Sequence, residues 1–360
     1  MQIGLWVPLL VTSHETPVAK SMTSSYAIAA NPNYDQSLYF GPGHHPRRST
    51  LEFACRAALE RLGCLGGTEN NPFLALRFSS LSSGTTRTFL NYGICRDGQM
   101  IFDSLTHVTH DGRWFETGLN ASEVELLKQM DEAGAQRAVL VGLAGYIDNH
   151  FVLEVCQRYP SRLIPCASFN PVAYSTPRQS RLAFRRELHN QSYRAWKLHP
   201  RLNRYNPLDP RCIAVLEELS SFGRRVPVWL DTLFYYRGGF MAKPVVDTIH
   251  ELVGTFSSLT FVLLHAGGTW IAHLAEAIRD CPNAFLDLSF TLHRYRSTSL
   301  SSDIRNLVAT FDRRLIFGSD FPEVSISSSL QSFHELTAGL PKEKCANVLG
   351  ANLGRILSSE

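Results

Sequence analysis

The feature that most constrains the fold is a repeated alternation of short β-branched runs with amphipathic segments, from about residue 100 to the end of the chain. This alternation is typical of βα units, in which a helix follows each strand of a parallel sheet. Eight repeats can be counted, and a closed barrel of such units takes about 250 residues. The sequence therefore predicts an α/β fold, a (β/α)8 TIM barrel over residues 100–360. The predicted strands are Met100–Leu105, Ala138–Leu143, Leu163–Phe169, Tyr193–Leu198, Val226–Leu230, Thr260–Leu264, Ala284–Leu288 and Arg314–Phe317.

Hydrophobic residues at helical spacing lie between these strands. Val124, Leu127 and Met130 recur with this period behind Asn120 or Ser122, either of which can serve as the N-cap. The pattern predicts helices at Ala121–Ala133, Pro210–Phe222, Trp270–Ile278 and Ser328–Leu340, and one or two closing helices over Lys342–Leu357, broken near Gly350.

Residues 1–99 do not follow this alternation. They are rich in Ser, Thr, Asn, Pro and Gly, with one predicted helix at Thr50–Leu62. We predict an N-terminal extension of uncertain structure. A small extra layer on the barrel, a partner-binding extension and a partly flexible segment are the alternatives.

Charge and cysteine usage exclude several classes of protein. The formal net charge is only +3 and the basic residues are scattered, which does not indicate nucleic-acid binding. The apolar run Ile3–Val11 is shorter than the ~20 residues that span a bilayer, and no basic residue precedes it as in a signal peptide. The eight cysteines form no CxxC pair, which favours a reducing compartment. We expect a cytoplasmic protein with a small-molecule substrate, no nucleic-acid or membrane partner, and a homo-oligomeric state as an open alternative.

Polar residues at the ends of the predicted strands are the candidates for chemistry, because the C-terminal ends of barrel strands carry the active site. We interpret Asp103, inside the first strand, as structural. The other polar residues at these positions are His107 after the first strand, Lys197 and His199 on the fourth, Asp231 on the fifth, His265 on the sixth, Asp287 on the seventh and Asp320 on the eighth.

The order and spacing of these residues resemble the amidohydrolase-2 group of metal-dependent hydrolases and decarboxylases. The most specific segments are Gly318–Pro322, Lys197–Pro200 and His265–Gly267, and Asn347–Asn352 resembles the helix that closes barrels of this group. The resemblance covers about the last 260 positions. It implies the barrel fold and an enzyme with its site at the strand ends.

In that group, the first strand ends in His-x-His, the fifth strand supplies another histidine and the eighth an aspartate, and together they hold a divalent metal. Here Leu105 occupies the first histidine position and Asp231 the fifth-strand position. Leucine cannot bind a metal, whereas aspartate is an oxygen ligand for Zn²⁺ or Mn²⁺. The resemblance thus implies an incomplete set of ligands for zinc or manganese, namely His107, Asp231 and Asp320, and leaves metal-independent catalysis open.

The resemblance also implies roles for individual residues. Asp320 and His265 are the predicted catalytic residues, and the structural alternative for Asp320 is a helix N-cap. For His107 and Asp231, hydrogen-bonded polar residues without a catalytic role are the alternative. Arginines at the pocket mouth would suit a carboxylate-bearing substrate, and ordinary surface arginines are the alternative. The predicted substrate-binding residues are Lys197 and His199 on the fourth strand, together with residues that follow strand ends and are predicted from this position to line the pocket mouth, namely Arg201, Tyr235, Arg237, Trp270 and His293.

Three functions are compatible with this pattern. The first is hydrolysis of a C–O or C–N bond in a small carboxylated or cyclic compound, such as a lactone or amide, with Asp320 as general base. The second is non-hydrolytic decarboxylation of a carboxylated aromatic or vinylogous acid. The third, motivated by Leu105 and Asp231, is a barrel without catalysis that serves as a binding or scaffold protein.

Overall fold

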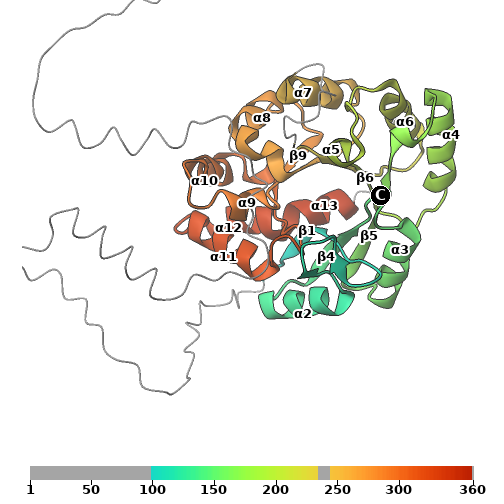
Figure 1. Ribbon diagram of the computed structural model, residues 1–360. Coiled ribbons are helices and arrows are strands. Elements are labelled where there is room, and N and C mark those ends of the chain that lie inside the picture. Colours follow the sequence, from blue (N-terminus) through green and yellow to red (C-terminus); the bar gives the residue numbers. More distant parts are fainter. Residues whose placement is uncertain (1–98, 234–243, 359–360) are drawn as a thin grey trace, which may run out of the picture. The chain divides into compact units, whose positions relative to one another are not determined.

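The structure is a computed structural model that describes residues 99–233 and 244–358. The predictions for residues 1–98, and those for Tyr235 and Arg237, lie outside the described residues. Eight parallel strands form one sheet in the order in which they occur along the chain (Figure 1), which confirms the predicted barrel. They are β1 (Phe102–Thr106), β4 (Arg137–Val141), β5 (Leu163–Phe169), β6 (Ala195–Leu198), β7 (Val228–Asp231), β8 (Phe261–Leu264), β9 (Ala284–Asp287) and β10 (Leu315–Ile316).

Helices surround this sheet as an outer ring (Figure 1). A hairpin, β2 (Arg113–Trp114) with β3 (Leu119–Asn120), precedes the first helix of the ring. Within the described residues, no helix has the length and apolarity needed to cross a membrane. The helices are α2 (Glu123–Ala133), α3 (Asn149–Arg158), α4 (Pro177–Leu188), α5 (Pro200–Asn203), α6 (Pro210–Ser221), α7 (Val245–Thr255), α8 (Ile271–Ala277), α9 (Thr291–Arg294), α10 (Leu300–Thr310), α11 (Ile326–Thr337), α12 (Lys342–Ala346) and α13 (Asn352–Ser358).

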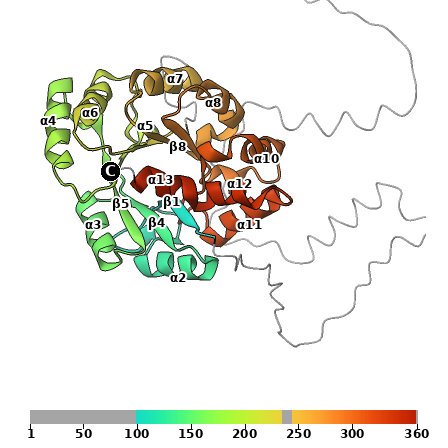
Figure 2. The same cartoon turned by 180° about the vertical axis from the view of Figure 1, so that it is seen from behind.

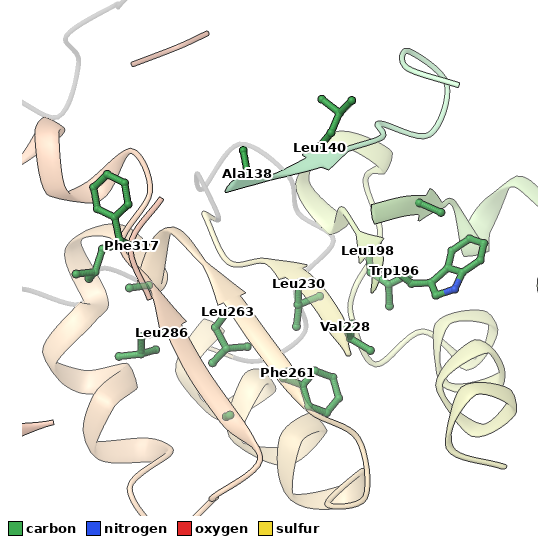
Figure 3. Close-up of a cluster of buried hydrophobic side chains, with 14 of the residues drawn as sticks. Ala138, Leu140, Trp196, Leu198, Val228, Leu230, Phe261, Leu263, Leu286 and Phe317 are labelled. Atoms are coloured by element: carbon green, nitrogen blue, oxygen red, sulfur yellow. The ribbon is translucent and has the colours of Figure 1, made fainter. Parts of the chain in front are cut away.

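Alternation along the strands divides the apolar side chains between two cores. On β4, Ala138 and Leu140 belong to the layer between strands and helices, of which Figure 3 shows a part, whereas Val139 and Val141 belong to a second cluster inside the barrel. Leu353 and Ile356 of α13 join this inner cluster. Helix α13 lies across the middle of the ring in both views (Figure 2) and contacts β1 and β10. Leu357, also on α13, lines a cavity beside the start of β5. The N-terminal end of the barrel is therefore covered.

Closure of the barrel depends on the segment that follows β10. Ser104 N donates to Phe317 O at 3.1 Å, Asp320 N to Leu105 O at 3.0 Å, and His107 N to Phe321 O at 2.9 Å. These bonds join the C-terminal half of β1 to residues 317–321. The same backbone that closes the barrel therefore positions two predicted site residues, His107 and Asp320.

The helix boundaries resolve three points that the sequence left open. Ser122 is the N-cap of α2, with its Oγ accepting from Glu125 N at 3.2 Å. Ser325 is the N-cap of α11, so Asp320 does not cap that helix. The predicted break near Gly350 is a π-helical turn, Asn347–Ala351, between α12 and α13. A Cβ at Gly350 would lie 2.6 Å from Met100 O, so only glycine lets the two backbones approach this closely.

Candidate active site

Strand alternation places a lysine and an aspartate on the inner face of the barrel. On β6, Trp196 and Leu198 pack outward in the layer of Figure 3, so Lys197 between them points inward. On β7, Leu230 packs outward and Asp231 points inward. Lys197 is 2% exposed and Asp231 is fully buried. Buried charges of this kind are tolerated only with partners.

His107 is the partner of Lys197. The ring Nδ1 of His107 lies 2.7 Å from Val141 O, which accepts only if Nδ1 carries the proton. Nε2 is therefore the unprotonated atom, and Lys197 Nζ lies 3.4 Å from it. Burial, with the nearby Lys197, holds the pKa of His107 well below its usual range. His107 is a neutral acceptor whose lone pair faces an amine.

Asp231 accepts from three basic side chains. Its Oδ2 lies 3.4 Å from His199 Nε2, 3.4 Å from Arg201 Nη2 and 3.3 Å from His265 Nε2. His199 Nδ1 accepts from Leu202 N, which places the ring proton on Nε2, facing the carboxylate. Burial alone would raise the pKa of Asp231, but His199, Arg201 and His265 outweigh burial and hold that pKa well below its ordinary value. Asp231 is an ionised carboxylate surrounded by donors.

His265 follows β8 in a left-handed conformation, with φ of 63°. Its Nδ1 lies 3.2 Å from Ser289 O and 3.1 Å from Ser289 Oγ, and its Nε2 faces Asp231. Burial lowers the pKa of His265, but Asp320 and Asp231 oppose burial, and the net pKa lies above the usual value. His265 is therefore held in one orientation by acceptors on both sides of its ring.

Asp320 also has a left-handed backbone, with φ of 69°. The preceding residue is fixed because Ser319 N donates to Asp103 Oδ1 at 2.9 Å. Asp320 Oδ1 lies 3.9 Å from His107 Nε2. Burial raises the pKa of Asp320, although His265 and Lys197 lower it. Sparsely populated backbone conformations persist where the surroundings enforce them, and they cluster at functional sites.

A buried network lies behind these residues. Asp287 accepts from the hydroxyls of Ser104 and Ser289 and from His265 N. A Cβ at Gly318 would lie 2.5 Å from Ser104 Oγ and 2.7 Å from Asp287 Oδ2, so glycine is required there for close packing. The network links β1, β8 and β9 and fixes the backbone of His265.

A cavity of about 270 Å³ lies at the C-terminal ends of the strands and contains most of the predicted residues. Two larger cavities, beside Leu357 and beside Met100, contain none of these buried strand-end residues. The site cavity also has apolar and aromatic walls that the sequence did not predict, since they come from loops. It is lined by His107, Trp114, Phe115, Leu143, Lys197, His199, Arg201, Leu202, Leu233, His265, Phe290, Asp320 and Glu323.

Two predicted substrate-binding residues do not line this cavity. Trp270 is 37% exposed and contacts His273 edge-on. His293 lies on α9, where its Nδ1 is 3.2 Å from Ser332 Oγ. By contrast, Trp114 of the β2–β3 hairpin stacks on His107 with ring centroids 5.3 Å apart. A tryptophan in the loop after the first strand was the sequence signal that could have indicated this wall.

The predicted metal ligands have other partners. Leu105 provides no ligand, Lys197 Nζ faces the lone pair of His107, and three donors share Asp231. Among the described residues, no group of three or more His, Cys, Asp or Glu side chains is arranged to hold a metal ion. This donor geometry does not fit the metal site of the resembled group.

Comparison with known proteins agrees with the fold. Residues 112–357 match the model of a family described as amidohydrolase. No curated protein sequence matches the chain. An uncharacterized TIM-barrel protein from Bordetella bronchiseptica is similar over 72% of this chain and 99% of its own, with a TM-score of 0.59 and 18% identity.

Two similar structures have named activities. A probable 2-pyrone-4,6-dicarboxylic acid hydrolase from Acinetobacter baumannii, with citric acid bound, has a TM-score of 0.52 and 18% identity over 71% of this chain and 98% of its own. A 5-carboxyvanillate decarboxylase from Novosphingobium aromaticivorans, complexed with manganese and 4-hydroxy-3-methoxy-5-nitrobenzoic acid, has a TM-score of 0.54 and 11% identity over 73% and 97%. At these identities, the likeness shows the fold alone.

Proposed function

Because the chain belongs to the amidohydrolase family, we propose that it hydrolyses a C–O or C–N bond of a small carboxylated or cyclic compound, such as a lactone or amide. Members of this family are hydrolases or decarboxylases. The observation that carries the proposal is the convergence of Asp320, His265 and Lys197 on one cavity at the strand ends.

Asp320 is the general base in this proposal. Its carboxylate is buried and lines the cavity, and its pKa lies above the ordinary value, which makes it a stronger base than an exposed carboxylate. It takes one proton from the attacking water, whose oxygen forms a bond to the carbonyl carbon. His265 orients that water through its fixed ring.

Lys197 stabilises the oxyanion that develops on the carbonyl oxygen. Its ammonium is buried beside His107, so it needs no reorganisation when negative charge forms. The tetrahedral intermediate then collapses, and the C–O or C–N bond breaks. The proton held by Asp320 passes to the leaving oxygen or nitrogen, which restores the carboxylate and balances the reaction.

Arg201 supports a carboxylate on the substrate. It lines the cavity, and its side chain is 36% exposed beside Asp231. A guanidinium can bind a carboxylate through two parallel hydrogen bonds. His199 Nε2 lies 3.4 Å from the same Oδ2 of Asp231. These residues would orient the substrate with its carboxylate toward α5.

Decarboxylation of a carboxylated aromatic or vinylogous acid is the second candidate. Trp114, Phe115 and Phe290 line the cavity, and aromatic walls favour a flat ring. In this case Arg201 or Lys197 would hold the carboxylate until the C–C bond breaks, and a protonated Asp320 would donate to the ring carbon. The released product is CO2.

A screen with two readouts tests the proposal. Lactones, amides and carboxylated aromatics are incubated in ¹⁸O-labelled water, and both label in the product and released CO2 are measured. Label without CO2 supports hydrolysis, and CO2 without label supports decarboxylation. A folded protein that binds carboxylated compounds but releases neither product would favour the scaffold function instead.

A further inference from the structure

Lys197 occupies the position at which a metal ion would meet the imidazole of His107. The lone pair on His107 Nε2 is the group that a metal would bind, since Nδ1 is bonded to Val141 O. Lys197 Nζ is 3.4 Å from that lone pair. Lys197 is 2% exposed and lies on β6, on the inner face of the barrel.

The carboxylates of the site favour a positive charge at this point. Asp320 Oδ1 also lies near this atom, 3.9 Å from His107 Nε2. Burial lowers the pKa of Lys197, and the carboxylates of Asp231 and Asp320 oppose this shift because they interact favourably with the charge on the amine. A buried cation with these neighbours performs one task of a metal ion, because it attracts an oxygen that acquires negative charge.

We propose that the Lys197 amine replaces the divalent cation in this barrel and, by covering the lone pair of His107, keeps divalent metal out of the site. Leu105 is consistent with this arrangement, since an imidazole there would have no metal to bind. The inference rests on no step of the proposed hydrolysis, because it concerns binding of zinc or manganese alone.

The test is a metal titration of the full chain after treatment with a chelator. Isothermal titration calorimetry with Zn²⁺ and Mn²⁺ is applied to the wild type and to Lys197→Met, which keeps the length and apolar stem of lysine but removes the amine. Removal of the amine exposes the His107 lone pair beside Asp320, so we expect the variant to bind one zinc per chain at least ~10-fold more tightly than the wild type, about 1.4 kcal/mol.

Three further variants keep the test decisive. Adding His107→Ala to Lys197→Met should remove the gain, which places the ion at His107. Lys128→Met, at an exposed lysine of α2, is the matched control and should bind as the wild type does. Lys197→Gln replaces Lys197→Met if circular dichroism shows the latter to be unfolded.

Stoichiometric zinc binding by the wild type with the affinity of Lys197→Met would overturn the proposal, because Lys197 would then not compete with the ion. Equal absence of binding in both would also overturn it, since the amine would not be what excludes the metal. A gain that survives His107→Ala would place the ion elsewhere and count against it as well.

Discussion

Replacement of Asp320 by asparagine separates catalysis from folding. Asparagine keeps the size of aspartate but carries neither the negative charge nor the basicity. It also tolerates a left-handed backbone such as the φ of 69° at this position. The structure assigns the N-cap of α11 to Ser325, so no helix loses its cap. The change therefore acts on the side-chain chemistry of the cavity.

The expected loss of activity is large and the expected loss of stability is nil. A positioned general base contributes ~10²–10⁴ in rate, so turnover should fall by at least ~10², about 2.7 kcal/mol in the activation barrier. Burial raises the pKa of Asp320, so the ionised carboxylate is disfavoured in the folded state. Removal of that charge should leave the free energy of unfolding at neutral pH unchanged or slightly higher.

The assay compares kcat/KM and urea unfolding of the wild type, Asp320→Asn and Asp280→Asn, using the substrate found in the screen. Asp280 is exposed after α8 and does not line the cavity, so its variant should match the wild type in both measurements. A folded Asp320→Asn protein with near-normal kcat/KM would refute the role of Asp320 as base. Equal losses of activity and stability would show a structural role instead.

Burial raises the pKa of Asp103 from 3.8 to about 7, so the stability that its protonated form provides should be lost as the pH rises through about 7. Urea unfolding from about pH 5 to about pH 8 should show Asp103→Asn gaining stability relative to the wild type as the pH rises, and parallel curves would contradict this. Ser289→Ala removes a hydroxyl 3.1 Å from His265 Nδ1 and should lower kcat about tenfold with little change in KM; a change confined to KM would argue against positioning. Trp114→Leu removes an aromatic wall beside His107 and should raise KM for aromatic substrates more than for lactones, whereas equal effects on both would exclude ring recognition.

The sequence was sufficient to predict the residues that strand alternation controls. Lys197 and Asp231 each lie in a strand whose neighbours are large and apolar, so their inward direction follows from a period of two. His265 and Asp320 follow strands directly, and parallel strands bring their ends to one face. The structure places Lys197, His107, Asp231, His265 and Asp320 around the C-terminal ends of the strands, as predicted.

The pairing of these side chains could not be predicted, because it depends on distances between strands far apart in the sequence. Lys197 contacts His107, which lies 90 positions earlier in the sequence. The tautomer of that histidine is set by Val141 O at the end of another strand, β4. The wall at Trp114 comes from a two-stranded hairpin too short to have a strand pattern. Loop residues such as Trp270 and His293 were assigned to the site by their position after a strand, which does not determine where a loop side chain points.

The aspartate at the fifth-strand position has an electrostatic explanation if Lys197 is the cation of the site. A histidine at the fifth-strand position would place another neutral or positive ring beside His199, Arg201 and His265, and it would remove the carboxylate that all three contact. Asp231 supplies the missing negative charge, with its Oδ2 within 3.4 Å of all three. Asp320 and Asp231 together raise the pKa of His265 against its burial, and Asp320 also interacts with Lys197 and His107. In this arrangement Asp231 balances His199, Arg201 and His265, and Asp320 is the carboxylate available for chemistry.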